Sequence, residues 1–343
     1  MKILSMLSAT IAGMLALASL SLESAAAGNM TEFYTGKTIR LVVGYGKGGG
    51  YDTFARLIAP LLEQETGANV VVENKPGSGG LAVLNDTSHS KPDGLTLTVA
   101  NVSASVTALL LASDAAMFHS NDFVWLGGIA SDARVLLLAD GTRLEDWLST
   151  LQTPPLIRWA ALGKSDSLAL SAALLTEAFG LKSRIITGFS GTSEAIAGLL
   201  RGQADAVVIS LETARQFIDT TGFTMAAVLS RTRSELAPEV PTIYELNNDP
   251  AAEKWLDYQV NLSGLGRALI VAPGTPRANV KFLSAALERI LTSEEFVAAA
   301  ASRGRSVRYT AAEDIENITR SILTSATEAD KKQLRQMLAN AYF

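Results

Sequence analysis

The 343-residue sequence contains no cysteine and only two histidines, His89 and His119. Without cysteine the chain forms no disulfide, carries no thiolate metal ligand and offers no cysteine for lipid attachment. This absence is compatible with an oxidising compartment but does not prove one. Neither histidine lies beside a nucleophile motif, because the G-x-S-x-G pattern does not occur, and no H-E-x-x-H motif is present. The sequence therefore predicts no catalytic constellation and no metal site.

Charged and aromatic residues are also sparse. Charged residues make up 18% of the chain and aromatic residues 6%, with a net charge of -5. This slightly acidic balance argues against nucleic acid as the main partner. Hydrophobic residues account for 48% of the chain, so a folded core is expected rather than disorder. The length suggests two domains of ordinary size.

The sequence opens with a pattern typical of a secretory signal peptide. Lys2 is followed by an apolar run over residues 3–22, and three alanines at 25–27 provide a cleavage site. The alternative is a transmembrane anchor, although the run is rich in Ala and Ser and only marginally long enough to span a bilayer. We therefore expect residues 1–27 to be removed and the mature protein to be soluble and periplasmic.

Beyond the signal segment, strand-like and helix-like patterns alternate. Apolar runs at 38–45, 68–74 and 94–101 indicate strands, and apolar residues recur at helical spacing between the first two. A second series of this kind covers 156–230, and a strand–turn–helix unit follows at 264–291. Strand–helix–strand order with short links predicts mostly parallel sheets covered by helices.

We expect two α/β domains with a cleft between them. A long apolar stretch interrupted by Gly127 and Gly128 has the pattern of a segment that runs from one domain into the other. On this basis the first domain is discontinuous and comprises residues 28–127 together with 264–343. The second domain comprises residues 128–263. The crossing segments then join the two domains and allow the cleft to open and close.

The first expected strand leads into a glycine-rich turn, GYGKGGGYD. Gly44, Gly46 and Gly49 match the G-x-G-x-x-G pattern, and Glu73 ends the next strand, where dinucleotide-binding folds place a ribose-binding acid. Asp52 is expected to cap the following helix. Glycines also let any ligand approach the backbone, and a helix N-terminus favours any anion. Two hypotheses stay open here: an oxidoreductase that binds a dinucleotide, and a receptor for a smaller anion. The signal peptide counts against the first, because exported proteins rarely meet free nicotinamide cofactor.

Three further turns combine glycine with other turn residues ahead of an expected helix. They lie at 76–80, 163–167 and 190–193. Their residues act as helix caps in any case. Because ligands bind beyond the carboxyl ends of strands in such sheets, we expect turns of both halves to meet around one pocket. Lys164 adds a cation that either meets an acidic ligand or lies on the solvated surface.

Residues 36–101 resemble the Bug family, also called TctC-like proteins, which are extracytoplasmic solute receptors of tripartite tricarboxylate transporters. The shared marks are the glycine-rich turn followed by Asp and an Ala-Arg helix, the VVVEN-x-PG-x-GG segment, and Pro-Asp-Gly before a strand. Later segments, LAPEVPTIYEL and VAPGTPRANVKFLSAALERIL, are also similar to the family. Lys47 stands where many relatives have proline, and the segments 207–217 and 247–267 match the family pattern poorly.

The resemblance implies an α/β periplasmic binding protein of the Venus-flytrap type, type II-like. It would be a solute-binding protein for transport, a monomer without cofactor or catalytic role. It would capture a small organic carboxylate, such as a di- or tricarboxylate, and deliver it to the membrane subunits of the transporter. A sensor subunit that presents the ligand to a receptor kinase would use the same pocket with a different partner.

In that family, two glycine turns of the first domain hold one carboxylate, largely through backbone amides and water, and loops of the second domain close over the rest. The positions that this implies here are Tyr45, Gly48, Gly49, Gly50, Asp52, Gly77, Ser78 and Gly79 in the first domain, and Gly163, Lys164, Ser165, Ser167, Ser190, Gly191, Thr192 and Ser193 in the second.

Overall fold

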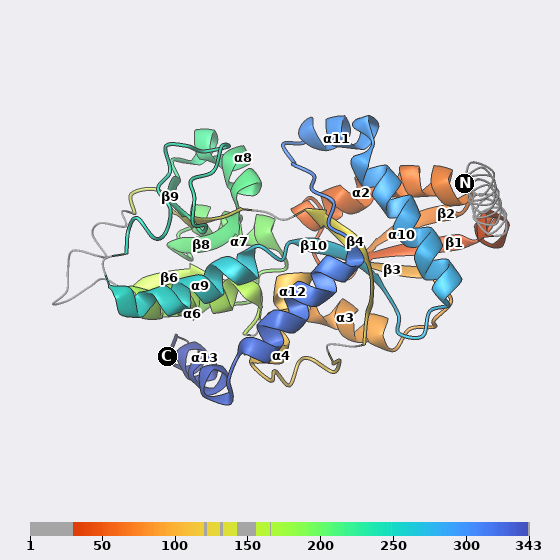
Figure 1. Cartoon of the computed structure of the whole chain (residues 1–343). Helices are drawn as coiled ribbons and strands as arrows, with labels where there is room; N and C mark the ends of the chain where they lie inside the picture. Colours follow the sequence, from red (N-terminus) through yellow and green to blue (C-terminus); the bar gives the residue numbers. More distant parts are fainter. Residues whose placement is uncertain are drawn as a thin grey trace, which may run out of the picture.

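Two lobes, each built on a five-stranded sheet, make up the protein in the computed structural model (Figure 1). The structure describes residues 30–119, 122–130, 133–142, 156–164, 166–247 and 249–341. The predicted signal peptide at 1–27 lies outside the described residues, and so does Ser165. No helix in the described ranges is both long and apolar enough to cross a membrane.

The first sheet contains four strands that run in one direction and a single reversed strand. Its spatial order is β2 (Asn69–Asn74), β1 (Thr38–Val43), β3 (Thr96–Asn101), β10 (Arg267–Val271) and β4 (Val124–Ala130). β2 and β3 pair parallel with β1, whereas β10 is antiparallel to both β3 and β4. The helices that pack around this sheet are α2 (Gly50–Thr66), α3 (Leu81–Ser88), α4 (Val102–Leu110), α10 (Arg277–Thr292), α11 (Glu294–Ala301) and α12 (Ala312–Ser325), and the short 3-10 helix η1 (Ser78–Gly80) precedes α3.

The second sheet repeats this arrangement. Its spatial order is β7 (Ser183–Ile186), β6 (Ile157–Ala160), β8 (Ala206–Ser210), β5 (Arg134–Leu138) and β9 (Thr224–Val228). β6 is parallel to β7 and β8, and β5 is antiparallel to β8 and β9. Among the described residues between β5 and β10, the helices of this lobe are α6 (Ser167–Ala178), α7 (Thr192–Leu200), α8 (Leu211–Thr221) and α9 (Glu253–Ser263), with the 3-10 helix η2 (Pro250–Ala252) before α9. The predicted α/β architecture is confirmed, but both sheets are mixed.

The reversed strand in each sheet brings its first residue to the cleft. In an antiparallel pair, the start of one strand lies beside the end of the other. Arg267, the first residue of β10, pairs with Asn101 at the end of β3. Arg134, the first residue of β5, pairs with Ser210 at the end of β8. Each arginine therefore lies at the edge of its sheet where the parallel strands end.

Buried apolar faces hold the helices on the sheets. In α2, Phe54, Ile58 and Leu62 recur at four-residue spacing and are at most 1% exposed. This spacing places them on one side of the helix, against β1 and β2. Gly67 ends the helix in a left-handed conformation with φ of 72°, which glycine adopts without a steric penalty. The glycine-rich turn that precedes α2 is therefore attached to a helix that packs on the sheet.

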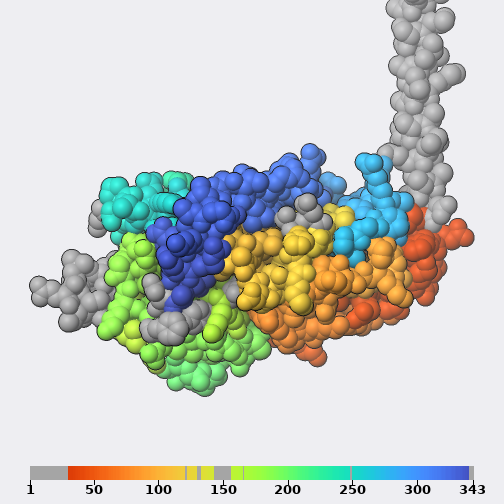
Figure 2. All heavy atoms as spheres, turned by 90° about the horizontal axis from the view of Figure 1, so that it is seen from below, coloured from red at the N-terminus to blue at the C-terminus, as the bar shows by residue number. Residues whose placement is uncertain are grey.

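The chain passes between the lobes more than once. It leaves the first sheet after β4 to enter β5, and it returns between α9 and β10. The final helix α13 (Glu328–Ala341) packs against α6 and β7, so it lies on the second lobe, although its sequence falls in the range predicted for the first domain. Figure 2 shows these dark-blue atoms beside the green atoms of the second lobe. The exact domain boundaries stay a prediction.

Candidate functional site

The four glycine-containing turns meet where the two lobes touch. The first turn (residues 44–52) contacts the 190–193 turn, because the Gly46 N–H donates to the Ser190 carbonyl at 3.4 Å. The second turn (residues 76–80) contacts the 163–167 turn. A Cβ placed on Gly79 would lie only 2.4 Å from the Cβ of Asp166. The turns of both lobes therefore lie around one space, as expected from the sequence.

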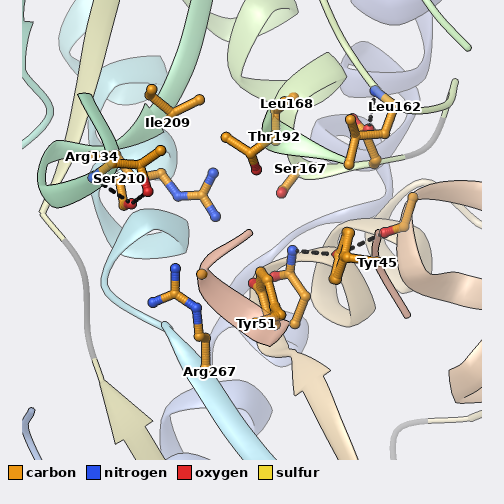
Figure 3. A pocket seen from close by; sticks show the side chains of 15 residues that line it. Tyr45, Tyr51, Arg134, Leu162, Ser167, Leu168, Thr192, Ile209, Ser210 and Arg267 are labelled. Atoms are coloured by element: carbon orange, nitrogen blue, oxygen red, sulfur yellow. Dashed lines mark hydrogen bonds between the residues drawn. The ribbon is translucent and has the colours of Figure 1, made fainter. Parts of the chain in front are cut away.

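A cavity lies between these turns (Figure 3). Its volume is about 30 Å³, counted as the space open to the centres of water-sized molecules, which is room for only two or three waters. A ligand of several heavy atoms therefore requires the lobes to separate somewhat. The first lobe contributes Tyr45, Gly50, Tyr51, Gly79, Asn101 and Arg267, and the second contributes Arg134, Leu162, Asp166, Ser167, Leu168, Thr192, Ile209, Ser210 and Thr213.

Two guanidinium groups enter this cavity, one from each lobe (Figure 3). Arg267 is 5% exposed, and its guanidinium carbon lies 4.7 Å from the centre of the Tyr51 ring and 5.3 Å from that of Phe54. Arg134 is half-buried, and within the described ranges no hydrogen bond or ion pair holds its side chain. The cavity is therefore electropositive and suited to an anion.

The sequence prediction missed both arginines. Each is the first residue of a strand whose other four residues are buried and apolar, RVLLL in β5 and RALIV in β10. A charged residue at the start of a buried apolar strand is unusual, and this pattern could have indicated both arginines as candidate site residues. The lining residues Ile209, Ser210 and Thr213 belong to the segment 207–217, and Arg267 to 247–267. Both segments that fit the family pattern poorly thus reach the cavity.

Tyr45 connects the first turn to its neighbours. Its hydroxyl donates to the Gly79 carbonyl at 2.8 Å and accepts from the Asn101 side-chain amide at 2.9 Å. Its ring stacks on Tyr51 with 4.3 Å between ring centres. Burial raises the pKa of the Tyr45 phenol well above its ordinary value, so the phenol stays neutral. Tyr45 lines the cavity as predicted, and it also fixes the second turn in place.

Asp52 fixes the first turn and does not line the cavity. Its carboxylate accepts hydrogen bonds from the Gly48 N–H at 2.9 Å, from the Arg56 guanidinium at 3.0 Å and from the Asn74 amide at 2.9 Å. Burial alone would raise the pKa of Asp52, but these hydrogen bonds outweigh it and lower the pKa. The prediction that Asp52 caps the helix is wrong, since Gly49 occupies the N-cap position and α2 begins at Gly50.

Asp166 organises the facing turn of the second lobe. It caps α6, and its carboxylate accepts from the backbone N–H groups of Leu162 at 2.5 Å, Gly163 at 2.9 Å and Ala169 at 2.7 Å. Burial raises the pKa of Asp166 to about 6, although these donors act in the opposite direction. Both carboxylate oxygens are engaged by the turn itself, so the turn keeps a fixed shape beside the cavity.

Two hydroxyl groups of the second lobe face the cavity. Ser167 and Thr192, both predicted site residues, point toward its centre (Figure 3). The Ser167 Oγ is buried and has no hydrogen-bond partner among the described residues. A buried hydroxyl without a partner is unfavourable unless a ligand or water completes it. Ser167 is therefore well placed to bind a ligand oxygen.

The remaining predicted residues surround the cavity without lining it. Tyr45, Gly50, Gly79, Ser167 and Thr192 line it, whereas Gly48, Gly49, Asp52, Gly77, Ser78, Gly163, Lys164, Ser190, Gly191 and Ser193 do not. Lys164, Ser190 and Ser193 are exposed. In the part of the chain that the structure describes, no group of three or more His, Cys, Asp or Glu could hold a metal ion.

Comparison with known proteins identifies this architecture. The family model described as "Tripartite tricarboxylate transporter family receptor" matches residues 54–328. Protein BugT of Bordetella pertussis (strain Tohama I) is 26% identical over 276 residues, which cover 79% of this chain and 81% of BugT.

Two solved structures share the fold. The periplasmic binding protein BugD has a TM-score of 0.73 at 22% identity, with 89% of this chain and 98% of BugD covered. MatC from Rhodopseudomonas palustris, solved with bound malate, has a TM-score of 0.72 at 22% identity, with 88% of this chain and 99% of MatC covered. The predicted two-domain periplasmic-binding-protein fold is thereby confirmed. The chain belongs to the receptor family of tripartite tricarboxylate transporters.

Proposed function

We propose that this protein captures a small organic carboxylate outside the cytoplasm and presents it to the membrane subunits of a tripartite transporter. The observation that carries this proposal is the cavity between the lobes, which two guanidinium groups and the buried Ser167 hydroxyl enter. Membership of the receptor family and the malate bound to MatC support it. The protein binds its ligand without chemical conversion.

Binding of useful strength needs both lobes. A micromolar dissociation constant corresponds to roughly −8 kcal/mol. A hydrogen bond to a charged group contributes about 1.5–3 kcal/mol, and one helix N-terminus at most ~2 kcal/mol. Several donors must therefore converge on the ligand, and among the described residues the turns of the two lobes bring such donors together around the cavity. Closure around the ligand is the corresponding motion.

The dinucleotide hypothesis is disfavoured by the contacts of the first turn. A Cβ on Gly44 would lie 2.6 Å from the Val83 side chain and 3.0 Å from Gly80 Cα, so this glycine serves the packing of the second turn. The Glu73 carboxylate accepts two hydrogen bonds from Arg40, at 2.8 and 2.7 Å. The residue expected to hold a ribose is thus engaged within the sheet.

The setting of the receptor is part of the proposal. A cleaved signal peptide at 1–27 delivers the chain to the periplasm, where it acts as a soluble monomer. The membrane subunits of the transporter are its partner. A sensor role would use the same cavity with a receptor kinase as partner, and capture from solubilised membranes with the mature protein as bait distinguishes the two.

A ligand panel tests the proposal. The mature protein is mixed with mono-, di- and tricarboxylates, including aromatic acids, and the midpoint of thermal unfolding is measured. A bound ligand raises this midpoint in a concentration-dependent way. We expect at least one carboxylate to do so, with confirmation by calorimetric titration. No shift with any carboxylate, or saturable binding of NAD(H) in a fluorescence titration, would reject the proposal.

A further inference from the structure

A loop of the first lobe contacts the second lobe outside the cavity. This loop, residues 302–306, follows α11, which packs on α2 and α10. It lies against the N-terminal half of α8, where the Gln216 side-chain amide donates to the Arg303 carbonyl at 3.0 Å. The Glu212 carboxylate accepts from the Ser306 N–H at 2.6 Å and also from the Ser306 hydroxyl. The loop is therefore held on α8 near both of its ends.

Arg305 is the buried cation of this loop. It is 4% exposed, and its Nη1 donates to the Thr213 Oγ1 at 2.8 Å. Arginine side chains are rarely this buried unless they are paired. Arg305 lines a separate surface recess beside the first turn, whereas Thr213 lines the cavity. Arg305 therefore contacts the wall of the cavity without entering it.

Thr213 and Ser210 form a pair of hydroxyl groups at the cavity. Their side-chain oxygens lie 2.7 Å apart, and the Thr213 N–H donates to the Ser210 Oγ at 3.4 Å. Both residues line the cavity, and Figure 3 shows Ser210 beside Arg134. Within the described ranges, the two hydroxyl groups form no further hydrogen bond except the one from Arg305. A chain of hydrogen bonds thus leads from the loop to the cavity.

The donors and acceptors of this chain limit its direction. A guanidinium donates and cannot accept, so the Thr213 oxygen must accept from Arg305. One of the two hydroxyl hydrogens lies between Thr213 and Ser210. The other hydrogen has no acceptor within the chain, whichever of the two residues carries it. The pair therefore presents one hydroxyl donor to the cavity, and a carboxylate oxygen accepts such a donor.

We propose that Arg305 is a positioning residue for the ligand, and that it acts by keeping the Thr213–Ser210 pair in the state that donates to the cavity. This inference rests on the proposed function and adds a residue outside the cavity on which ligand affinity depends. An acceptor at position 305 would take the Thr213 hydrogen, and Ser210 would then donate to Thr213. The pair would present only oxygen lone pairs to the cavity, which is unfavourable for an anion. Arg305 also polarises the chain, which strengthens the donor at its end.

Substitutions of Arg305 that differ in hydrogen-bonding character test this role. The probe is whichever of succinate, malate, citrate and benzoate binds the wild type most tightly in calorimetric titration. Arg305→Gln introduces an acceptor and should lower the affinity about tenfold, whereas Arg305→Lys, which only donates, should stay within about threefold. Wild-type affinity in Arg305→Gln would overturn the proposal. An equal loss in Arg305→Lys would also overturn it, because packing and not donor character would then be responsible.

Arg303→Gln is the matched control for these variants. It removes the same charge from an exposed position of the same loop, and the Gln216 amide binds the Arg303 backbone carbonyl, which the substitution retains. This variant should bind the probe like the wild type. A tenfold loss here, about as large as in Arg305→Gln, would show that the charge of the loop matters and that the hydrogen-bond chain does not.

A double-mutant cycle distinguishes this route from a general effect on folding. Thr213→Val removes the hydroxyl and keeps the shape of the side chain, so Arg305 no longer reaches Ser210 through it. In this background, adding Arg305→Gln should change the affinity less than about twofold, since both residues act through one chain. A further loss of about tenfold would overturn the route through Thr213. Denaturant unfolding verifies that each variant is folded under the conditions of the titration.

A last pair of variants retains Arg305 and tests the chain from its other end. Thr213→Ser keeps the hydroxyl and should bind the probe within about threefold of the wild type, whereas Thr213→Val should bind it about fivefold more weakly. Equal affinities of these two variants would overturn the role of the hydroxyl pair. Absence of binding by all four acids would instead remove the proposed function, and this inference with it, so the two failures are distinguishable.

Discussion

Replacement of Gly79 by alanine is the sharpest test of how closely the lobes must approach. Gly79 has φ of 66°, and its added Cβ would lie 2.4 Å from the Cβ of Asp166 in the opposite lobe. Ordinary carbon–carbon contacts are about 3.5–4.0 Å, so the facing turn must withdraw by roughly 1 Å or more. Asp166 cannot yield locally, because three backbone N–H groups hold its carboxylate. The substitution should therefore keep the cleft partly open.

The expected effect separates into a stability part and an affinity part. A side chain in the left-handed region costs about 1–2 kcal/mol of stability, whatever its surroundings. Displacement of the turn that carries Ser167 removes a hydrogen bond to a charged ligand, about 1.5–3 kcal/mol, which is a loss of roughly 10- to 150-fold in affinity. Thermal unfolding measures the first part, and calorimetric titration with the carboxylate found in the panel measures the second.

Gly36→Ala provides the matched control. Gly36 has φ of 73°, and nothing lies within 4 Å of an added Cβ. This variant should lose a similar amount of stability and keep the wild-type affinity. If Gly79→Ala bound the ligand as tightly as Gly36→Ala, the close approach of the Gly79 turn to the Asp166 turn would not be needed for binding, and the reasoning from this contact would be refuted.

Three further substitutions give distinct outcomes. Gly50→Ala should displace the Arg267 guanidinium, which lies 2.7 Å from the added Cβ, and lower ligand affinity at least tenfold by titration; unchanged affinity would contradict the role of Arg267. Ser167→Ala should weaken binding about tenfold while the free energy of unfolding of the ligand-free protein stays the same or rises, because the buried hydroxyl has no partner among the described residues; a clear loss of stability would contradict this. Burial raises the pKa of Asp166 from 3.8 to about 6, so the protonated carboxyl group stabilises the fold below pH ~4, and this stabilisation is lost as the pH rises through ~6. In denaturant unfolding over this pH range, the wild type should lose up to about 3 kcal/mol of unfolding free energy relative to Asp166→Asn. A constant difference between the two proteins would refute this prediction.

The turns could be predicted from the sequence because their signals are local. A strand, a glycine-rich turn and a capped helix follow each other within a few residues, so the positions of Gly50, Gly79, Ser167 and Thr192 near the cleft follow from sequence order. Similarly, the alternation of strand-like and helix-like patterns was sufficient to predict two α/β lobes. The signal peptide prediction concerns residues outside those that the structure describes.

The arginines could not be predicted in the same way because their position depends on strand order. β5 and β10 follow other strands along the chain with no local mark of their reversed direction, and only that direction brings Arg134 and Arg267 to the cleft. Asp52 fixes the first turn partly through a hydrogen bond from Asn74, which lies 22 positions later in the sequence, so its neighbours alone did not indicate this role. Long-range pairing of this kind leaves little trace in composition or periodicity.

The path of the C-terminal segment has a practical consequence. α12 packs on β4 of the first lobe, whereas α13 lies on α6 of the second, where the Lys254 ammonium of α9 forms an ion pair with Asp330. The described chain begins at Met30 in the first lobe (Figure 1). Its two ends therefore move with opposite lobes. Donor and acceptor fluorophores at these ends would report closure directly, so that the receptor becomes an optical sensor for its own ligand without any insertion into the fold.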